Sequence, residues 1–522
     1  MLFLRKASPV IYLAGLTALA IGLPLWLLLM SISQFILLGA WLLDGNIKQK
    51  IKAAFRNPVI AVTIGIYLLH IAGLIFTSDL KYALDDLRVK LPLLILPLVI
   101  GTMPALSKKH FDFILKVLLS STFIATVYCT AVWLGYSGVE VNDIRDISVF
   151  ISHIRFSLII CMCLVIIKYL LRSEMTITIR SLMILLAVWF IIFLFILQSL
   201  TGIVILMCMI ITSLIYIFWK RKNKMLKGVS LLLLGALITG SIYLYQYIFI
   251  QSVKPVAIQS SMLMNKTALG GTYTHNLKAY DEENGNPVWI NVCEMEMDSA
   301  WNAISKYKYS EHDADGQMLR FTLIRFLTSK NLTKDAAGIK NLSAEEIHAI
   351  ENGIANVDYI KGSTINIRLK QLAWEYRSYY YSGNPSGHSI MQRFEFWKTG
   401  LYIFKKQPLT GTGTGDIKKE YELAYKEINT PLTEDFRLRA HNEYLTMFIT
   451  FGFAGGIYFL LAMIYPWIKL RKWNDLLYTA SLSIILLSMI MEDTPESQAG
   501  ATIMAFFCTF FLFHDYGRRE IS

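Results

Sequence analysis

Hydrophobic runs of membrane-spanning length recur along most of the chain. Many approach the roughly 20 apolar residues that a bilayer core requires, and polar or charged residues separate one run from the next. This pattern predicts an all-α polytopic membrane protein with about 12 transmembrane helices. The expected spans are residues 10–22, 25–43, 58–76, 91–103, 111–134, 149–170, 182–197, 202–218, 229–250, 444–468, 476–491 and 501–513.

A long polar segment interrupts this pattern between the ninth and tenth spans. We therefore expect residues 1–250 to hold helices 1–9, residues 251–440 to form a large, mainly helical domain, and residues 441–522 to hold helices 10–12. A hairpin is expected over residues 270–292 and a helix over residues 391–406. Further helices are expected at residues 294–308, 343–352, 364–381 and 416–427, the second with a Ser343/Glu346 capping box.

The stretch from residue 391 to 456 holds the most informative pattern. Phe394, Trp397, Leu401 and Phe404 recur at steps of three and four, which predicts one apolar face of a helix with Arg393 lying off it. His441 and Asn442 come directly before the span at residues 444–468. A cationic side chain and a titratable imidazole are thus predicted at the mouth of the membrane part.

Composition and charge fit this membrane interpretation and suggest an orientation. Hydrophobic residues make up 55% of the chain and charged residues 17%, with a mean hydropathy of +0.47. Lysine and arginine gather in alternate loops, so the positive-inside rule predicts cytoplasmic termini and an outward-facing segment 251–440. These basic groups lie at residues 48–56, 108–109, 172–180, 220–227, 469–472 and 518–519.

The charge balance, the cysteine positions and the sequence motifs reduce the number of function classes that fit the chain. Segment 251–440 holds 23 Lys and Arg against 22 Asp and Glu, so the net charge of +12 belongs to the loops and gives no support for a nucleic-acid partner. Five of the six cysteines lie in apolar spans and only Cys293 lies in a polar region. No disulfide framework follows, and no HExxH or CxxC motif indicates a metal site.

Two side chains at the outward rim of the membrane part are candidates for catalysis. His441 can accept a proton from an attacking hydroxyl near neutral pH, because the unperturbed pKa of histidine is about 6.5. The alternative is a helix-start histidine that hydrogen-bonds its neighbours. Arg393 can bind two phosphate oxygens with its planar guanidinium. The alternative is an ordinary surface ion pair, for example with Glu395.

Three further cations are candidates for binding an anion. Lys90 and Arg88 lie at the outer end of the fourth span, where the positive-inside rule disfavours cations. Pairing with Asp85 and Asp86, or snorkelling, is the alternative. Arg155 lies within the outer part of the sixth span, and an ionisable residue inside a span is by default a functional candidate. A buried ion pair is its alternative.

Weaker signals lie nearby. The amides of Gly411, Gly413 and Gly415 could face an anion, although a flexible turn before the helix at residues 416–427 is the simpler interpretation. Glu492 and Asp493 follow the eleventh span and, with Asn442, are expected to support the site by orienting His441 or an acceptor sugar. Helix capping is the simpler role for the two acids.

Taken together, these residues resemble the O-antigen ligase and polymerase family of bacterial envelope enzymes. The resemblance is carried by Arg393-x3-Trp397, by Pro408 with the glycine turn and Asp416, and by His441-Asn442-x-Tyr444-Leu445 before Gly452. The tight first hairpin and Lys90-Leu91-Pro92 also fit. The long insert is similar to the enlarged periplasmic loop of Bacteroidetes-type members of the family.

The resemblance implies a multi-pass protein of the bacterial inner membrane with a periplasmic active site and no cofactor. It implies a metal-independent, inverting glycosyltransferase that moves a glycan from undecaprenyl diphosphate to a hydroxyl of lipid A–core. His441 would then be the base, Arg393 and Lys90 would hold the diphosphate, and Arg88 and Arg155 would assist. The alternatives are an O-antigen polymerase, a protein O-glycan ligase and, from another class, a lipid-linked glycan transporter.

One position departs from the family pattern. The family commonly has an arginine at the turn between spans seven and eight, where this chain has Leu200. Either Arg155 supplies the missing charge from a neighbouring span, or the donor is held differently, or this copy is impaired.

Overall fold

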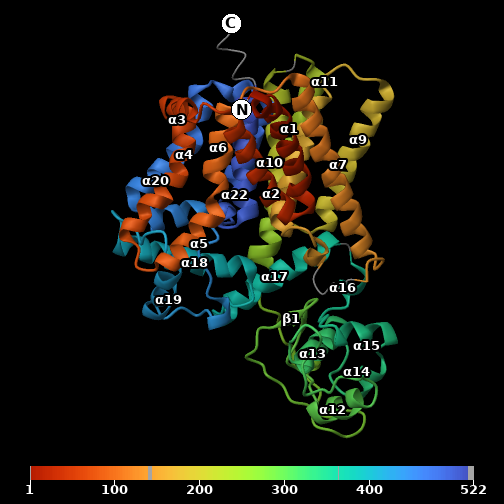
Figure 1. Ribbon diagram of the computed structural model, residues 1–522. Helices are drawn as coiled ribbons and strands as arrows, with labels where there is room; N and C mark the ends of the chain where they lie inside the picture. The colour runs from red at the N-terminus through yellow and green to blue at the C-terminus, as the bar shows by residue number, and fades with distance from the viewer. Residues whose placement is uncertain (1, 139–143, 221, 363, 515–522) are drawn as a thin grey trace. The chain divides into compact units, whose positions relative to one another are not determined.

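The computed structural model describes residues 2–138, 144–220, 222–362 and 364–514 (Figure 1). Within these ranges the chain divides into two compact units, residues 1–234 with 392–522, and residues 235–391. Arg221 and the basic pair Arg518 and Arg519, which entered the topology prediction, lie outside the described residues.

The first unit is a helical bundle, which confirms the predicted all-α polytopic class. Nine described helices are long and apolar enough to cross a membrane. The predicted spans at residues 91–103, 476–491 and 501–513 form shorter helices of 11, 13 and 16 residues. The helices of this unit, two of which extend into the second, are α1 (Leu2–Leu25), α2 (Leu27–Asp44), α3 (Ile47–Arg56), α4 (Pro58–Ala72), α5 (Leu80–Lys90), α6 (Pro92–Thr102), α7 (Lys108–Trp133), α8 (His153–Leu170), α9 (Ile177–Ile196), α10 (Leu200–Lys220), α11 (Lys224–Tyr245), α18 (Ser389–Lys406), α19 (Ile417–Glu427), α20 (Glu443–Lys469), α21 (Leu476–Ser488) and α22 (Gln498–Phe513).

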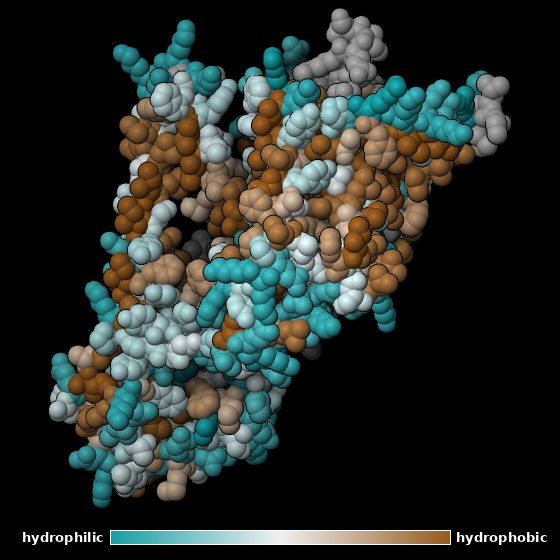
Figure 2. Space-filling model, turned by 90° about the vertical axis from the view of Figure 1, so that its left-hand side faces the viewer, coloured by the Kyte–Doolittle hydropathy of each residue, from teal (hydrophilic) through white to brown (hydrophobic). Residues whose placement is uncertain are grey.

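The short helix α22 lies at the centre of this bundle. Every residue from Ala499 to Phe513 is buried, and the helix packs against α5, α6, α8 and α21. A helix that is apolar on all sides belongs inside a protein or a membrane. The face of the bundle drawn in Figure 2 also carries broad apolar areas, as a bilayer requires. The core therefore supports the loop that precedes α22, which carries Glu492 and Glu496.

The glycine turn at residues 411–415 differs from both sequence interpretations. Helix α20 is broken at Gly452, whose φ of 65° suits glycine, and the glycine turn fills the break. The amides of Thr412 and Gly413 donate to the carbonyls of Ile449 and Thr450 at 2.9 and 3.0 Å. The turn is buried and its amides are occupied, so it is neither flexible nor open to an anion.

Helix α18 confirms the predicted helix but turns a different face inward. Its buried side includes Phe396, Thr399 and Ile403, whereas Phe394 and Leu401 of the predicted apolar stripe are exposed. The reason is the neighbouring small core, in which Phe396 and Ile403 pack with residues of α19 and α20.

The second unit, residues 235–391, combines short helices with one small hairpin. The hairpin is predicted correctly, with Asn284 and Gly285 at its turn, but each strand has only two residues. The Ser343/Glu346 capping box is confirmed. The predicted helix at residues 294–308 ends at Asn302. The elements are β1 (Glu282–Glu283), β2 (Asn286–Pro287), α12 (Glu294–Asn302), α13 (Leu319–Ser329), α14 (Ala336–Lys340), α15 (Ala344–Glu351), α16 (Asp358–Lys361) and α17 (Thr364–Ser382).

Candidate functional site

His441 occupies a tight connection directly before α20. Its backbone has φ of +46°, in the left-handed region that few non-glycine residues adopt, although histidine tolerates it better than most. Asn442 caps the helix by accepting a hydrogen bond from the amide of Leu445 at 3.0 Å, and its side-chain amide donates to the carbonyl of Ile490 at 3.0 Å. Asn442 thereby fixes the connection against the loop after α21.

Glu492, from that loop, lies between His441 and Arg393. Its Oε1 is 3.1 Å from Nη2 of Arg393, and its Oε2 is 3.6 Å from Nδ1 of His441. Arg393 also donates from Nε to the carbonyl of Met491 at 3.3 Å. We call Arg393, Glu492 and His441 the Glu492 bridge. The structure thus brings together three of the predicted site residues, from helix α18, the connection before α20 and the α21–α22 loop.

The Glu492 bridge is only partly covered. The side chain of His441 is 35% exposed and that of Arg393 is 22% exposed, while Glu492 is 9% exposed. Burial raises the pKa of Glu492, but His441, Arg393 and Arg155 outweigh burial and lower that pKa below its usual range. The carboxylate is therefore ionised, and it orients a histidine and an arginine that solvent reaches.

Arg155, at the start of α8, lies near the same carboxylate. Its Nη1 donates to Ser152 Oγ at 3.2 Å, and its buried Nε has no hydrogen-bond partner among the described residues. A Cβ placed on Gly500 would stand 3.2 Å from that nitrogen, so glycine leaves the guanidinium its room. Arg155 thus adds a second arginine to the surroundings of Glu492.

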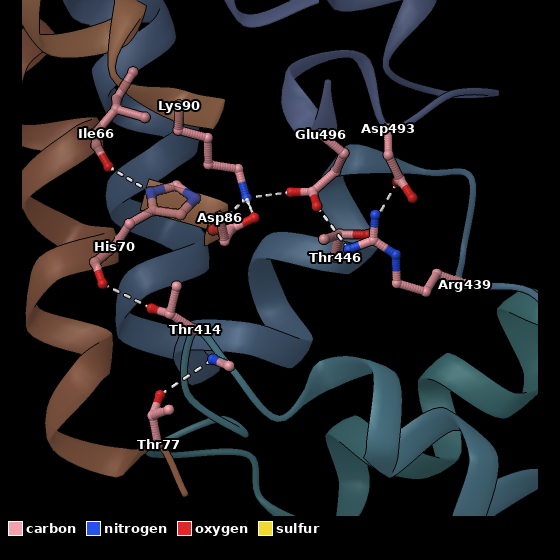
Figure 3. A network of polar contacts seen from close by, with 11 residues as sticks. Ile66, His70, Thr77, Asp86, Lys90, Thr414, Arg439, Thr446, Asp493 and Glu496 are labelled. Carbon is pink, nitrogen blue, oxygen red and sulfur yellow. Dashed lines mark hydrogen bonds and ion pairs between the residues drawn. The ribbon is translucent and has the colours of Figure 1, made fainter. Parts of the chain in front are cut away.

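Lys90 belongs to a separate, more deeply buried network. Its Nζ donates to Asp86 at 2.7 and 2.9 Å and also pairs with Glu496, whose other oxygen lies 2.6 Å from Nη1 of Arg439 (Figure 3). We call Asp86, Lys90, Glu496 and Arg439 the Glu496 bridge. The Lys90 side chain is only 4% exposed and pairs with Asp86. This is the alternative that the sequence allowed for Lys90.

The electrostatics of the Glu496 bridge follow from its burial. Burial raises the pKa of Glu496, but Lys90 and Arg439 outweigh it and hold the pKa far below its usual range. Burial, followed by the charge of Glu496, raises the pKa of neighbouring Asp493, which also accepts a hydrogen bond from Thr446 Oγ1 at 3.0 Å. Asp493 therefore lies beside the Glu496 bridge, although Glu492 precedes it in sequence.

Arg88 lies elsewhere on α5. Its guanidinium is 3.3 Å from Asp85, and both side chains are largely exposed, at 78% and 59%. This is the surface ion pair that the sequence allowed as an alternative.

The comparison with known proteins bears on the same region. Residues 346–460 match the family model described as O-antigen ligase. The chain contains an O-antigen ligase domain. No curated protein matches the chain by sequence.

The matched residues hold two of the three members of the Glu492 bridge and one of the four members of the Glu496 bridge. Arg393, Arg439 and His441 lie within the matched residues, whereas Glu492 and Glu496 come from the loop after α21 and Lys90 and Arg155 come from the first half of the chain. The match supports a function of glycosyltransferase type in O-antigen processing, and nine described helices are long and apolar enough to cross a membrane.

Sequence reasoning missed Arg439, Asp86 and Glu496 as parts of the site. Arg439 stands two residues before His441, in the same connection between helices. This proximity in sequence is a signal by which Arg439 could have been predicted as a site residue. Glu496 stands four residues after Glu492 across a turn that contains Pro495, and nothing in the sequence indicates that the two carboxylates turn to different cations.

Across the described ranges, no group of three or more His, Cys, Asp and Glu side chains is arranged to hold a metal ion. The metal independence implied by the family resemblance stays a prediction.

Proposed function

We propose that this protein is an inverting glycosyltransferase that moves a glycan from undecaprenyl diphosphate to a sugar hydroxyl of lipid A–core. The observation that supports this proposal best is the Glu492 bridge, in which one buried carboxylate orients a partly exposed histidine and a partly exposed arginine. A proton acceptor and an anion-binding group are the two functions that such a transfer requires.

In this proposal His441 acts as the general base. The Nδ1 side of the imidazole faces Glu492, which stabilises the imidazolium and leaves Nε2 to take the proton of the acceptor hydroxyl. The acceptor oxygen then forms a bond to the anomeric carbon of the donor, from the face opposite the leaving group. A positioned base contributes roughly 10²–10⁴-fold to such a step.

The leaving group is a lipid diphosphate, which departs with the electron pair of the broken anomeric C–O bond. It needs positive charge more than a proton, because a diphosphate is already a weak base. Arg393 offers a planar fork for two phosphate oxygens, and Arg155 has a buried Nε without a hydrogen-bond partner in the described part of the chain. We assign the diphosphate to these two arginines, with Arg155 in the place of the arginine absent at Leu200.

Lys90 takes a different role in this proposal. Because two carboxylates already neutralise its ammonium group in a buried position, we assign Lys90 to positioning Glu496 and Arg439 rather than to the donor. Arg88, which is exposed beside Asp85, is left as a surface residue. The donor headgroup and the positive-inside pattern favour a periplasmic site with both termini cytoplasmic.

Purified protein supplied with lipid-linked glycan and two alternative acceptors tests the proposal. We expect glycan transfer to lipid A–core, unaffected by a chelator, and transfer slowed by roughly 10²–10⁴-fold in the His441→Ala variant. Extension of the lipid-linked glycan itself would instead identify a polymerase. Absence of transfer to either acceptor by wild-type protein, or full activity in His441→Ala, would overturn the assignment.

A further inference from the structure

Helix α18 exposes large apolar side chains on one face while it buries several polar ones. Phe394 and Leu401 are 52% and 50% exposed, whereas Gln392, Glu395 and Thr399 are buried. A surface helix of a soluble protein buries its apolar stripe and exposes its polar side. The exposed apolar side chains of α18 form a continuous face with the half-buried Trp397 and Phe404; we call Phe394, Trp397, Leu401 and Phe404 the α18 stripe.

The neighbouring helix α19 shows the normal polarity. It packs Ile417, Tyr421 and Tyr425 into the same small core and exposes Lys418 and Glu422 to its surroundings. The exposed apolar face is therefore a property of α18 and not of this region of the bundle.

Specific contacts fix the rotation of α18 about its axis. Phe396 and Ile403 are inserted into the core with α19 and α20, and Nε1 of Trp397 donates to the carbonyl of Ala440 at 3.0 Å. The buried polar groups have partners, since Thr399 Oγ1 donates to the carbonyl of Glu395 at 2.8 Å and Thr430 Oγ1 donates to the Glu395 carboxylate at 3.4 Å. Turning the stripe inward would break this set of contacts.

The α18 stripe continues into the outer surface of a membrane-spanning helix. Phe404 meets Phe448 of α20 edge to face with ring centroids 5.8 Å apart, and Phe448 lies 6.2 Å from Phe453. Phe453 is exposed, as are Leu461 and Ile468 farther along α20. Aromatic contacts thus join the stripe to the surface that α20 presents to acyl chains.

We propose that the α18 stripe docks into the membrane, at the boundary between lipid headgroups and acyl chains. Its residue types are those of interfacial helices, which combine Trp, Phe and Leu on one face with lysines at the border. Here the exposed Lys398 and Lys405 border the stripe and suit anionic lipid phosphates. Arg393 precedes the stripe, so docking holds its guanidinium at the depth of a lipid headgroup. The docking does not depend on the proposed reaction.

Spin labels on the full-length protein in lipid nanodiscs test this docking. Cysteine is introduced as Phe394→Cys or Leu401→Cys in a Cys208→Ala background, because Cys208 is less buried than the other five cysteines. We expect collisions with oxygen to be frequent and collisions with a water-soluble nickel chelate to be rare at both positions. The matched control on α19, Lys418→Cys, should show the reverse.

Two outcomes would overturn the docking proposal, and a second experiment tests it if a spin label disturbs the fold. Ready access of the nickel chelate to Phe394→Cys and Leu401→Cys would overturn the proposal. Strong dipolar broadening between labels on two protein molecules would also overturn it, in favour of a second copy covering the stripe. Should a label disturb the fold, unmodified protein can be photolabelled with a headgroup-proximal diazirine lipid, and adducts must then fall on residues 394–404 and not on α19.

Discussion

The loop between α21 and α22 supplies two glutamates, four residues apart. Each pairs with two basic side chains, but the two pairs lie in different surroundings. Glu492 joins Arg393 and His441, and Glu496 joins Lys90 and Arg439. The cation and imidazole of the Glu492 bridge remain partly exposed, whereas Lys90 is almost fully buried and shared by two carboxylates. An ion pair that solvent reaches can exchange a partner for a ligand, but a buried and saturated one holds the chain in place.

This contrast has an energetic basis. Removing one partner from a buried ion pair leaves an uncompensated charge and costs roughly 3–5 kcal/mol, whereas exposed pairs contribute about 0–1 kcal/mol. Substitutions in the Glu492 bridge should therefore change catalysis more than stability, and substitutions in the Glu496 bridge should change stability first.

The largest expected effect is that of His441→Ala on transfer rate. Loss of the general base should lower kcat by roughly 10²–10⁴-fold, with little change in unfolding temperature, because the imidazole is partly exposed. Initial rates with lipid-linked glycan and lipid A–core measure this. The control is His110→Ala, which removes an exposed histidine at the start of α7. A comparable loss in the control would disconnect the effect from the Glu492 bridge.

Lys90→Met should produce the largest loss of stability. It leaves Asp86 without its buried cation and Glu496 with Arg439 alone, and the free energy of unfolding should fall by roughly 3–5 kcal/mol. Denaturant unfolding of the purified protein measures the loss, and Lys109→Met, at an exposed lysine, is the control. Adding Asp86→Asn should restore part of the stability. Unchanged stability with abolished donor binding would return Lys90 to the diphosphate site.

Arg393→Ala should weaken donor use by about 10²-fold, in the range found when one donor to a developing charge is removed. Arg393→Lys should lose less, since it keeps the charge but not the two-pronged geometry. Steady-state kinetics with varied donor concentration separate these variants, and Lys418→Ala on the exposed side of the neighbouring helix α19 is the control. Near-normal donor kinetics in both Arg393 variants would remove the arginine from the mechanism.

Acid should act on stability chiefly through Glu496. Its pKa is lower in the folded protein than in the unfolded chain, so its contribution is fully present above the usual glutamate pKa of about 4.3 and is lost as pH falls below that value. Unfolding between pH 7 and 3 should therefore show a steeper loss for wild type than for Glu496→Gln. Parallel curves for the two proteins would contradict the assignment.

The helices, and Arg393 and His441 of the Glu492 bridge, could be predicted from the sequence because each is marked by a pattern of nearby residues. Apolar runs identify α1, α7 and α20, and the His441-Asn442 pair before a span marks the cap of α20. The partition of the carboxylates could not be predicted, because Glu492 and Glu496 find their cations through contacts of the folded bundle. The outward stripe of α18 was missed for a related reason, since helical periodicity identifies an apolar face but does not say whether protein or lipid covers it.

The smallest expected effect is that of Arg88→Ala, at an ion pair that belongs to neither bridge. Arg88 lies on α5 two residues before Lys90, but its pair with Asp85 is exposed to solvent. Because water and salt screen such a pair, Arg88→Ala should change the free energy of unfolding by less than about 1 kcal/mol and leave transfer unaffected. The same denaturant and rate measurements used for Lys90→Met test this. A large loss of donor binding in Arg88→Ala would mean that the lipid headgroup reaches α5, and the division between a ligand-facing bridge and a structural bridge would then have to include the exposed side of this helix.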